Sequence, residues 1–366
     1  MNRKKLAIAV IIVLLLLVIV GLGISKVSNA RRSLIPSMSF DEMLRFTTRG
    51  NVEAVITVGV IRKGEASFTV YGKDATILPN EEYKYEIGSV TKTFTSSLLC
   101  KAIYEGRIAL SDHINQYVLL PSKEYYPTFK RLVTHTSGYK SHYFDIQMIF
   151  NFLRGEPNDF YGISVEKFNK KIGKIRVKDQ DYDFNYSNFG MSVVGSALAE
   201  VYDSDYKTVM NQFIKTDLGL LSTSISASSE SLSGSWNWKP DDGYLPAGAI
   251  ISTISDMLKY VQLHLSEELP YLALGHEVLA LVGTNLRQKQ YEMMGIRIDA
   301  TGIGWMIDTA NKIVWHNGGT TNFNSYVAFD KEKQLGVVIL SNLAPDYRIP
   351  ATLMGSKLMI ALQSEC

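Results

Sequence analysis

Tyr85-Glu-Ile-Gly-Ser89-Val-Thr-Lys92-Thr-Phe-Thr-Ser-Ser-Leu-Leu-Cys100 is the stretch around which the chain is organised. After a Gly-Ser turn, apolar residues recur at positions 90, 94, 98 and 102, and this spacing predicts one face of a helix. Ser89 would lie in the first turn, with Lys92 one turn further along the same face. An amine can take the proton of a nearby serine hydroxyl, and the N–H groups at a helix N-terminus can stabilise an oxyanion. The stretch therefore predicts a nucleophilic serine with a lysine activator.

The Ser-x-x-Lys spacing does not identify the nucleophile by itself. It recurs at Ser137/Lys140, Ser164/Lys167 and Ser204/Lys207. An ordinary solvated helix surface explains any one of these pairs equally well. The argument for Ser89 depends on two segments further along the chain.

Composition limits the class of protein. The 366 residues are 46% hydrophobic and 20% charged, which is typical of a folded globular chain with one large domain or two closely packed ones. The net charge is +2 and the body of the chain has no cluster of Lys and Arg, so no nucleic-acid partner is expected. Two cysteines, Cys100 and Cys366, form no disulfide framework, and we expect both to be free thiols. No cofactor-binding motif appears.

The N-terminus predicts a membrane segment. Arg3, Lys4 and Lys5 precede an uncharged run of 19 residues, 6–24, which is long enough to cross a bilayer as a helix with the basic cluster on the cytoplasmic side. We interpret residues 1–25 as a signal anchor and 26–40 as a linker, so that the rest of the chain is extracytoplasmic. The alternative is a cleaved signal peptide and a secreted protein, because small residues near Ala30 suit a signal peptidase.

The order of elements predicts an α+β fold. A capped helix begins near Ser39, and residues 52–61 and 66–71 form a hairpin. A mainly helical middle follows, with a long surface loop over 221–246. Four turn-linked strands (302–308, 312–317, 324–330 and 335–341) then predict an antiparallel meander, closed by a helix over 349–362. We expect one antiparallel sheet flanked by helices within a domain of residues 41–366. Its α/β part would comprise about 41–108 and 250–366, with a helical part (about 109–249) inserted.

Two short segments strengthen the case for Ser89. Tyr186-Ser187-Asn188 stands in a turn before a helix, where a phenol can relay protons if an ammonium lowers its pKa. The amide of Asn188 can hold both a lysine and a substrate carbonyl. His316-Asn317-Gly318-Gly319 ends a strand, and its glycines would let a substrate lie close to the backbone. An ordinary turn and a structural histidine are the alternatives for segments of this kind.

Ser89-Val-Thr-Lys92, Tyr186-Ser-Asn188 and His316-Asn-Gly318 resemble, in this order, the motifs of the serine β-lactamase and penicillin-binding protein superfamily. Leu132-Val-Thr-His-Thr-Ser-Gly138 and Leu245-Pro-Ala-Gly-Ala-Ile-Ile-Ser-Thr253 resemble segments of its class C branch. That branch also holds D-alanyl-D-alanine carboxypeptidases, D-aminopeptidases and carboxylesterases. The resemblance covers roughly residues 45–345.

The resemblance implies a β-lactamase/transpeptidase-like fold with a cleft between the two parts, and a role for each motif. Ser89 would be the acylated nucleophile, Lys92 its activator and Tyr186 a proton relay. Asn188 would orient Lys92 and the substrate amide. His316, Asn317, Gly318 and Gly319 would bind substrate, with the N–H groups of Gly319 and Ser89 holding the oxyanion. His135 and Ser137 would be turn architecture, and no metal or cofactor is implied.

Departures from the family pattern concern the substrate. Many β-lactamases of this superfamily have a lysine at the position of His316 and a threonine at that of Asn317. The carboxypeptidases with histidine use an arginine on the preceding strand, which residues 302–308 lack. Arg287 or Arg297 could substitute from a loop.

These features together predict an extracytoplasmic, membrane-anchored serine hydrolase that acts through an acyl-enzyme. Its substrate would be a D-amino-acyl peptide or ester of the cell envelope, as in a D,D-carboxypeptidase or esterase, and β-lactams are candidate covalent ligands. The alternatives are a β-lactamase proper and a non-catalytic protein that binds penicillin or peptidoglycan.

Overall fold

The computed structural model of the chain describes residues 35–225, 232–284 and 286–365. The predicted signal anchor and most of the predicted linker lie outside these residues, as does Cys366. None of the helices in the described part combines the length and apolar character needed to cross a membrane.

The N-terminal hairpin and the C-terminal meander form one sheet, as the sequence predicts. Its nine strands are all antiparallel and lie in the order β3-β2-β1-β12-β11-β10-β9-β8-β7. Register is fixed where the two chain segments meet, with Ile56 opposite Ser341 and Arg62 opposite Leu335. The strand bounds are β1 Ile56–Arg62, β2 Glu65–Tyr71, β3 Ile77–Leu78, β7 Ala280–Leu281, β8 Ala300–Thr301, β9 Met306–Asp308, β10 Ile313–Gly319, β11 Asn324–Asp330 and β12 Leu335–Ser341.

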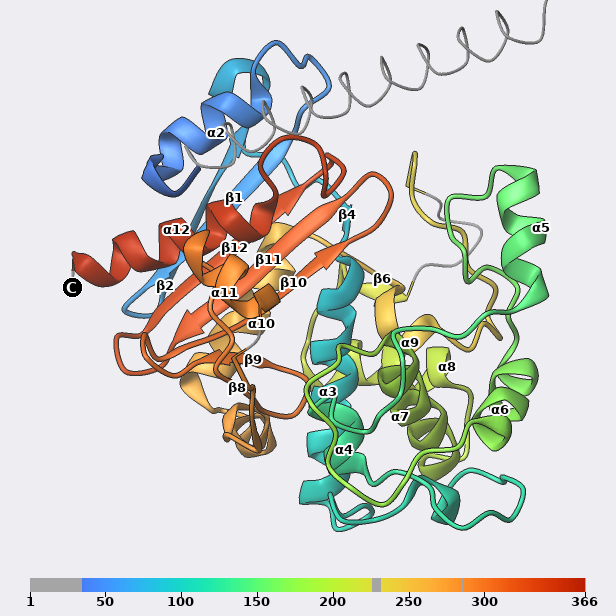
Figure 1. Cartoon of the computed structure of the whole chain (residues 1–366). Helices are drawn as coiled ribbons and strands as arrows, with labels where there is room; N and C mark the ends of the chain where they lie inside the picture. Colours follow the sequence, from blue (N-terminus) through green and yellow to red (C-terminus); the bar gives the residue numbers. More distant parts are fainter. Residues whose placement is uncertain (1–34, 226–231, 285, 366) are drawn as a thin grey trace, which may run out of the picture.

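Helices cover both faces of this sheet (Figure 1). On one face α2 (Phe40–Thr48) and α12 (Ala351–Ser364) pack over Val337 and Ile339 of β12. On the other face α10 (Ile254–Ser266) packs over Val338. Because both faces are covered, every residue of β12 is buried and the strand has no polar alternation. A capping box between Ser39 and Glu42 starts α2 where the sequence predicts it.

A helical part lies beside the sheet (Figure 1). It contains α4 (Phe129–Val133), α5 (Ile146–Arg154), α6 (Val165–Lys174), α7 (Asn188–Val201) and α8 (Tyr206–Gln212). A second, three-stranded sheet in the order β4-β6-β5 links it to the main sheet (β4 Tyr85–Glu86, β5 Ser224–Ile225, β6 Ile250–Ser252). The short helix α9 (Leu245–Gly248) precedes β6, and α11 (Leu286–Met293) precedes β8.

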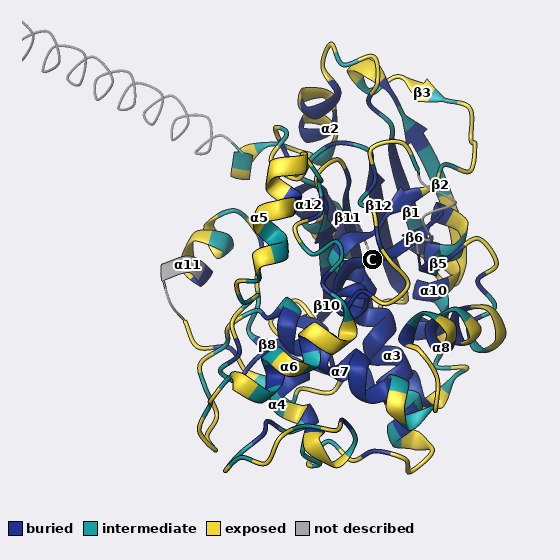
Figure 2. Cartoon of the chain, turned by 90° about the vertical axis from the view of Figure 1, so that its right-hand side faces the viewer, coloured by how far each residue is buried: buried dark blue, intermediate teal, exposed yellow. Residues whose placement is uncertain are grey.

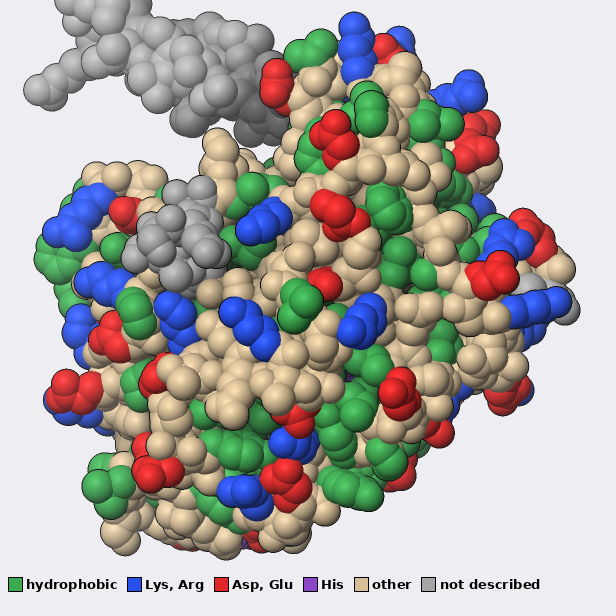
Figure 3. Space-filling model, turned by 180° about the vertical axis from the view of Figure 1, so that it is seen from behind, with side chains coloured by type: hydrophobic (Ala, Val, Ile, Leu, Met, Phe, Trp, Pro, Cys, Tyr) green, Lys and Arg blue, Asp and Glu red, His purple; other side chains and the backbone are tan. Residues whose placement is uncertain are grey.

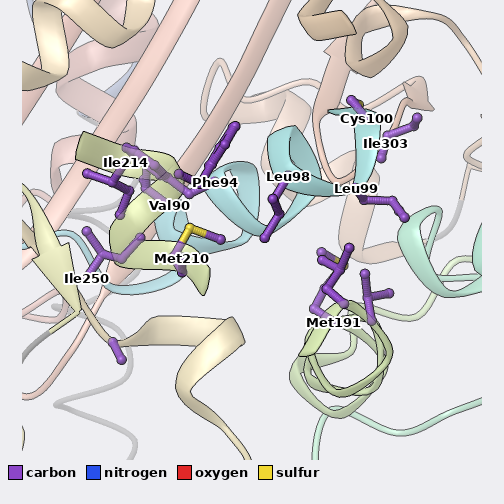
Figure 4. Close-up of a cluster of buried hydrophobic side chains, with 14 of the residues drawn as sticks. Val90, Phe94, Leu98, Leu99, Cys100, Met191, Met210, Ile214, Ile250 and Ile303 are labelled. Carbon is purple, nitrogen blue, oxygen red and sulfur yellow. The ribbon is translucent and has the colours of Figure 1, made fainter. Parts of the chain in front are cut away.

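Helix α3 (Thr91–Tyr104) lies between the sheet and the helical part, and most of its residues are buried on every side (Figure 2). Val90, Phe94 and Leu98 pack in a buried apolar cluster, as the periodicity predicts (Figure 4). The hydroxyl-bearing residues on its other faces are also buried, and most of them form hydrogen bonds. Thr95 donates to the Pro246 carbonyl at 2.8 Å. The prediction of a helix with one buried face was therefore too narrow, because a neighbouring element covers each face of α3.

The predicted long loop over 221–246 is confirmed in that residues 232–244 form no helix or strand, but part of the segment is regular or buried and does not lie at the surface. β5 and α9 belong to it, and the Trp238 side chain is only 2% exposed. Asp242, which is also buried, accepts hydrogen bonds from the backbone N–H groups of Gly162 and Lys239 at 2.8 Å. Aromatic packing and backbone hydrogen bonds hold this segment in place without helical or strand periodicity. Residues 226–231 lie outside the described residues.

Candidate active site

The Ser89 hydroxyl stands on a 3-10 turn (Gly88–Val90) between β4 and α3. The last residues of β10 run directly against this turn. A Cβ atom at Gly318 would lie 1.9 Å from the Ile87 carbonyl oxygen, and one at Gly88 would lie 2.6 Å from the Gly319 nitrogen. Gly88 also has a φ of +49°, which favours glycine. The glycines thus let the β10 backbone pack against the turn that bears Ser89.

Lys92 is completely buried beneath Ser89. Its Nζ atom lies 2.9 Å from Ser89 Oγ and 2.7 Å from the carbonyl oxygen of Ala247. Burial lowers the pKa of Lys92 well below its usual value. An ammonium donates to both oxygens, whereas the neutral amine, which burial favours, has a lone pair that can accept the Ser89 proton. The geometry is that of a lysine base beside a serine nucleophile.

Tyr186 contacts the same hydroxyl from the helical part. Burial raises its pKa above the usual value, and the hydrogen bond with the Ser89 side chain opposes that rise. Lys92 Nζ lies 5.0 Å from the centre of the Tyr186 ring. The sequence predicts a pKa lowered by a nearby ammonium, but the pKa of Tyr186 is raised, because desolvation outweighs the hydrogen bond with Ser89. Tyr186 therefore keeps its proton at neutral pH and suits a role as proton donor, with Lys92 as base.

Asn188 contacts a partner that the sequence does not indicate. It begins α7, capped by the Ser187 hydroxyl, which accepts from the Gly190 N–H at 2.8 Å. Its Nδ2 atom donates to Ser141 Oγ at 3.3 Å, while Lys92 has the Ala247 carbonyl as its second partner. Ala247 lies in the segment that resembles the family's Pro-Ala-Gly sequence. A backbone carbonyl carries no side-chain signal, so the sequence did not indicate this contact; it assigned the orientation of Lys92 to Asn188 instead.

His316 is fully buried on β10 and is uncharged. Its Nδ1–H donates to the Asn317 carbonyl at 2.7 Å, so Nε2 carries a lone pair, and this atom has no partner among the described residues. Burial and the nearby Lys92 lower its pKa to about 3. Its ring centre lies 6.1 Å from that of Tyr186. His316 therefore offers an acceptor beside Tyr186 at neutral pH, not a cation.

His135 also packs against Tyr186, but the ring atom that it leaves free among the described residues is a hydrogen-bond donor, whereas that of His316 is an acceptor. Its Nδ1 accepts from the Ser187 N–H at 3.2 Å, which leaves the proton on Nε2, and this N–H has no partner among the described residues. The two ring centres, of His135 and Tyr186, lie 4.7 Å apart. Burial lowers the pKa of His135 well below its usual value. The sequence predicted a residue of turn architecture, and its φ of +59° fits that role, but it also packs against the predicted proton relay.

The side chain of Asn317 is not brought to the site. It follows His316 on the strand and so points to the other face of the sheet, where its amide donates to Thr352 of α12 at 2.9 Å. Arg297, one candidate for a substrate-binding cation, pairs with Asp299 at 2.9 Å. The side chain of Arg287 lies outside the described residues.

Glu86 is a buried acid that no sequence pattern identified. It is 2% exposed on β4 and accepts hydrogen bonds from the Trp236 N–H at 2.8 Å and from Thr320 Oγ1 at 2.7 Å. Burial raises its pKa to about 7. Trp236 Nε1 also donates to Thr321 at 2.8 Å. Glu86 thus ties the turn that bears Ser89 to the end of β10 and to the Trp236 segment.

A family model described as Beta-lactamase matches residues 47–353. The chain belongs to the β-lactamase family. This assignment confirms the resemblance to the serine β-lactamase and penicillin-binding protein superfamily, a superfamily of serine hydrolases. The match includes Ser89, Lys92, Tyr186 and His316.

Curated relatives are distant. The chain is 24% identical over 294 residues to Protein flp of Staphylococcus aureus, a match that covers 75% of this chain and 56% of that protein. It is 27% identical over 329 residues to a β-lactamase of Pseudomonas fluorescens, covering 79% of this chain and 88% of the relative. The chain therefore spans about half the length of the flp proteins.

Two solved structures share the fold of this β-lactamase family member. One is an octameric penicillin-binding protein homologue of Pyrococcus abyssi, with a TM-score of 0.69 and 20% identity over 88% of this chain and 75% of that one. The other is a β-lactamase/D-alanine carboxypeptidase of Yersinia pestis complexed with citrate, with a TM-score of 0.67 and 19% identity. The match covers 91% of this chain and 98% of that one. They confirm the predicted antiparallel sheet with flanking helices.

Proposed function

We propose that this chain is an extracytoplasmic serine hydrolase, anchored by residues 1–25, that cleaves D-amino-acyl ester or peptide groups of the cell envelope. The observation that carries the proposal is the 2.9 Å contact between Ser89 Oγ and the buried amine of Lys92. A lysine whose pKa is lowered by burial is a competent base near neutral pH. The site has a nucleophile, a base and a proton donor in contact, which counts against the non-catalytic alternative.

The reaction proceeds in two halves. Neutral Lys92 takes the Ser89 proton as Oγ attacks the substrate carbonyl carbon, and the N–H groups of Ser89 and Gly319 stabilise the oxyanion. As the tetrahedral intermediate collapses, Tyr186 gives its proton to the leaving group and regains one from Lys92. Water then attacks the acyl-enzyme along the same route, releases the acid and restores the Ser89 hydroxyl.

The charge of the site favours an ester over a peptide that ends in a free carboxylate. His316 is neutral, Asn317 points to α12, and Arg297 is paired with Asp299. None of these three described side chains offers a carboxylate the free cation that commonly binds it. The preferred substrate is therefore an acyl ester of a D-amino acid, with a D-alanyl-D-alanine peptide second.

A β-lactamase proper is the second candidate. The relative from Pseudomonas fluorescens, which is named a β-lactamase, favours this candidate. The match covers 88% of that relative's length. The absence of a fixed cation at His316 favours slow acylation by β-lactams over rapid turnover.

Steady-state hydrolysis of three substrates tests the proposal. A D-alanyl ester, a D-alanyl-D-alanine peptide and a cephalosporin are compared at equal concentration, with Ser89→Ala as the control variant. The proposal predicts Ser89-dependent turnover with the ester ahead of the peptide and the cephalosporin. Fastest turnover of the cephalosporin would establish a β-lactamase, and no turnover by folded wild type would favour a binding protein.

A further inference from the structure

Helix α5 exposes large apolar side chains on the surface of the helical part. Within ten residues, six such side chains are exposed: Phe144 (63%), Ile146 (55%), Ile149 (42%), Phe150 (47%), Phe152 (79%) and Leu153 (72%). Figure 1 shows α5 at the edge of the molecule, and Figure 2 shows that much of its surface is exposed. A concentration of this kind marks an interaction surface in a protein, whereas single exposed apolar residues need no explanation.

Helix α5 turns its apolar side outward and its polar Asn151 inward, and hydrogen bonds hold the helix in this orientation. At about 100° per residue, the exposed apolar residues of the helix cover an arc of about 160°. Asn151 lies on the opposite side and is fully buried. Its Nδ2 atom donates to the carbonyls of Asn158, Asp159 and Tyr161, and its Oδ1 accepts from Gln147. Rolling the helix to hide its apolar side would break these bonds, so the exposed face is a built feature.

Basic residues lie beside this apolar face. On α6 the side chains of Lys167, Lys171 and Lys174 fall within a narrow arc, to one side of the buried Phe168 and Ile172. Lys171 Nζ donates to the Phe144 carbonyl at 2.8 Å, which joins this stripe to the start of α5. Figure 3, with the helical part on the left, shows apolar and basic side chains along that edge, with acidic ones among them. An apolar helix face with flanking lysines suits the boundary between acyl chains and anionic headgroups.

We propose that Phe144 and the exposed face of α5 dock into a lipid bilayer, with the α6 lysines contacting anionic headgroups. The inference rests on the membrane anchoring in the proposed function, since an uncharged run over residues 6–24 would hold the domain next to a bilayer. Two observations on the described residues favour lipid over a protein partner. The face is apolar across its whole width, and lysines of α6 lie beside it, although Asp145 caps α5 and Glu166 pairs with Lys170.

Docking would turn the active site toward the bilayer. Ser141, which accepts the hydrogen bond of Asn188, precedes the exposed Phe144 by three residues. After α5 the chain returns to the site, where the Phe160 ring centre lies 6.3 Å from that of Trp236. Short segments therefore join the docked face to residues of the site on both sides of α5. The substrate class that fits is an acyl ester on envelope material attached to the membrane.

Fluorescence quenching by lipids tests the docking. The full-length chain with Cys366→Ser receives Phe150→Cys, is labelled with a nitrobenzoxadiazole probe, and is reconstituted in phosphatidylcholine vesicles with phosphatidylglycerol. Cys100 is buried and does not compete for the label. The matched control carries the probe through Ile360→Cys on α12, which Figure 1 shows on the far side from α5. Spin-labelled lipids should quench the probe at 150 and leave the probe at 360 unchanged.

Other outcomes would overturn the docking. If spin-labelled lipid leaves the probe emission unchanged at position 150 as well as at position 360, docking is excluded. A change in the emission of the probe at position 150 that grows with protein concentration in detergent, without quenching by lipid, would assign the face to a second copy of the chain. Ester hydrolysis measured in the same vesicles reports separately on the proposed function. Ser89-dependent turnover without quenching would contradict the docking alone, and quenching without turnover would contradict the hydrolase alone.

Discussion

Helices α3 and α5 depart from ordinary helix polarity in opposite directions. α3 buries a lysine, three threonines and two serines, and most of these groups find partners within the described fold, as Lys92 does in Ser89 and Ala247. α5 buries Asn151 and exposes phenylalanine and leucine side chains to the surroundings. Buried polar groups with close partners mark the place where chemistry is carried out. Exposed apolar groups on a rigidly held helix mark a surface that meets something apolar.

The largest effect is expected from Lys92→Met. Removal of the base should lower kcat/KM on an ester by about 10⁴-fold, since general base catalysis contributes up to that factor. The wild-type rate should rise with pH through the lowered pKa of Lys92, because only the neutral amine accepts the Ser89 proton.

Lys207→Met is the matched control, because Lys207 has the same Ser-x-x-Lys spacing, after Ser204, and lies half-buried on α8. It should leave kcat/KM unchanged. Equal losses of kcat/KM in the two variants would contradict the role of Lys92 as the base.

Tyr186→Phe should have a smaller effect that depends on the leaving group. With an alkyl ester, whose alkoxide needs a proton, kcat should fall by about 10²-fold. With a nitrophenyl ester the loss should be slight, because nitrophenolate leaves without a proton. A phenylalanine ring still packs against His135 and His316, so the fold is kept. Steady-state kinetics on the two esters decide, and equal losses would contradict the donor role of Tyr186.

Glu86→Gln should change how the stability of the protein depends on pH. The pKa of Glu86 is raised from 4.5 to about 7, so between these values the folded state binds more protons than the unfolded state. Stability should therefore fall as pH rises through this window, by on the order of 3 kcal/mol. A glutamine amide offers similar hydrogen-bonding atoms without the charge, and the variant should lose this slope. Chemical denaturation at pH 5 and pH 7.5 measures it, and an unchanged slope would exclude Glu86 as its cause.

The smallest effect is expected on α5. Phe150→Ser and Leu153→Ser should change the free energy of unfolding by less than about 0.5 kcal/mol, as exposed sites usually do. Phe94→Ala on α3 should cost about 3–5 kcal/mol by opening a cavity in the core. Urea denaturation compares them. A loss above about 1 kcal/mol, twice the expected bound, in either serine variant would show that the α5 face packs against this chain.

The sequence predicts the features that repeat or that resemble a family. The shared sheet of hairpin and meander, and the segments around Ser89, Tyr186 and His316, follow from periodicity and motif order, whereas the β1–β12 pairing that joins them needed the structure. Contacts made through the backbone could not be predicted, as with the Ala247 carbonyl beside Lys92. Glu86 escaped notice because its partners, Trp236 and Thr320, are remote in sequence.

The inverted polarity of α5 also needed the structure. An amphipathic pattern does not say which face a fold covers, and the buried side is set by the bonds of Asn151 to residues 158–161. For the same reason Asn317 was assigned to the substrate, since its side of the strand depends on register. Tertiary contacts, not local pattern, decide these positions.

Intact mass after reaction with a fluorophosphonate shows whether Ser89 is the nucleophile that Lys92 activates. The full-length protein is treated near neutral pH alongside Ser89→Ala, and the site of any adduct is mapped by peptide analysis. The account predicts one phosphonyl group on Ser89 of the wild type, formed faster as pH rises, and none on the variant. Folded wild type that stays unmodified, or an adduct on another serine, would contradict the assignment of Ser89 as a nucleophile activated by Lys92.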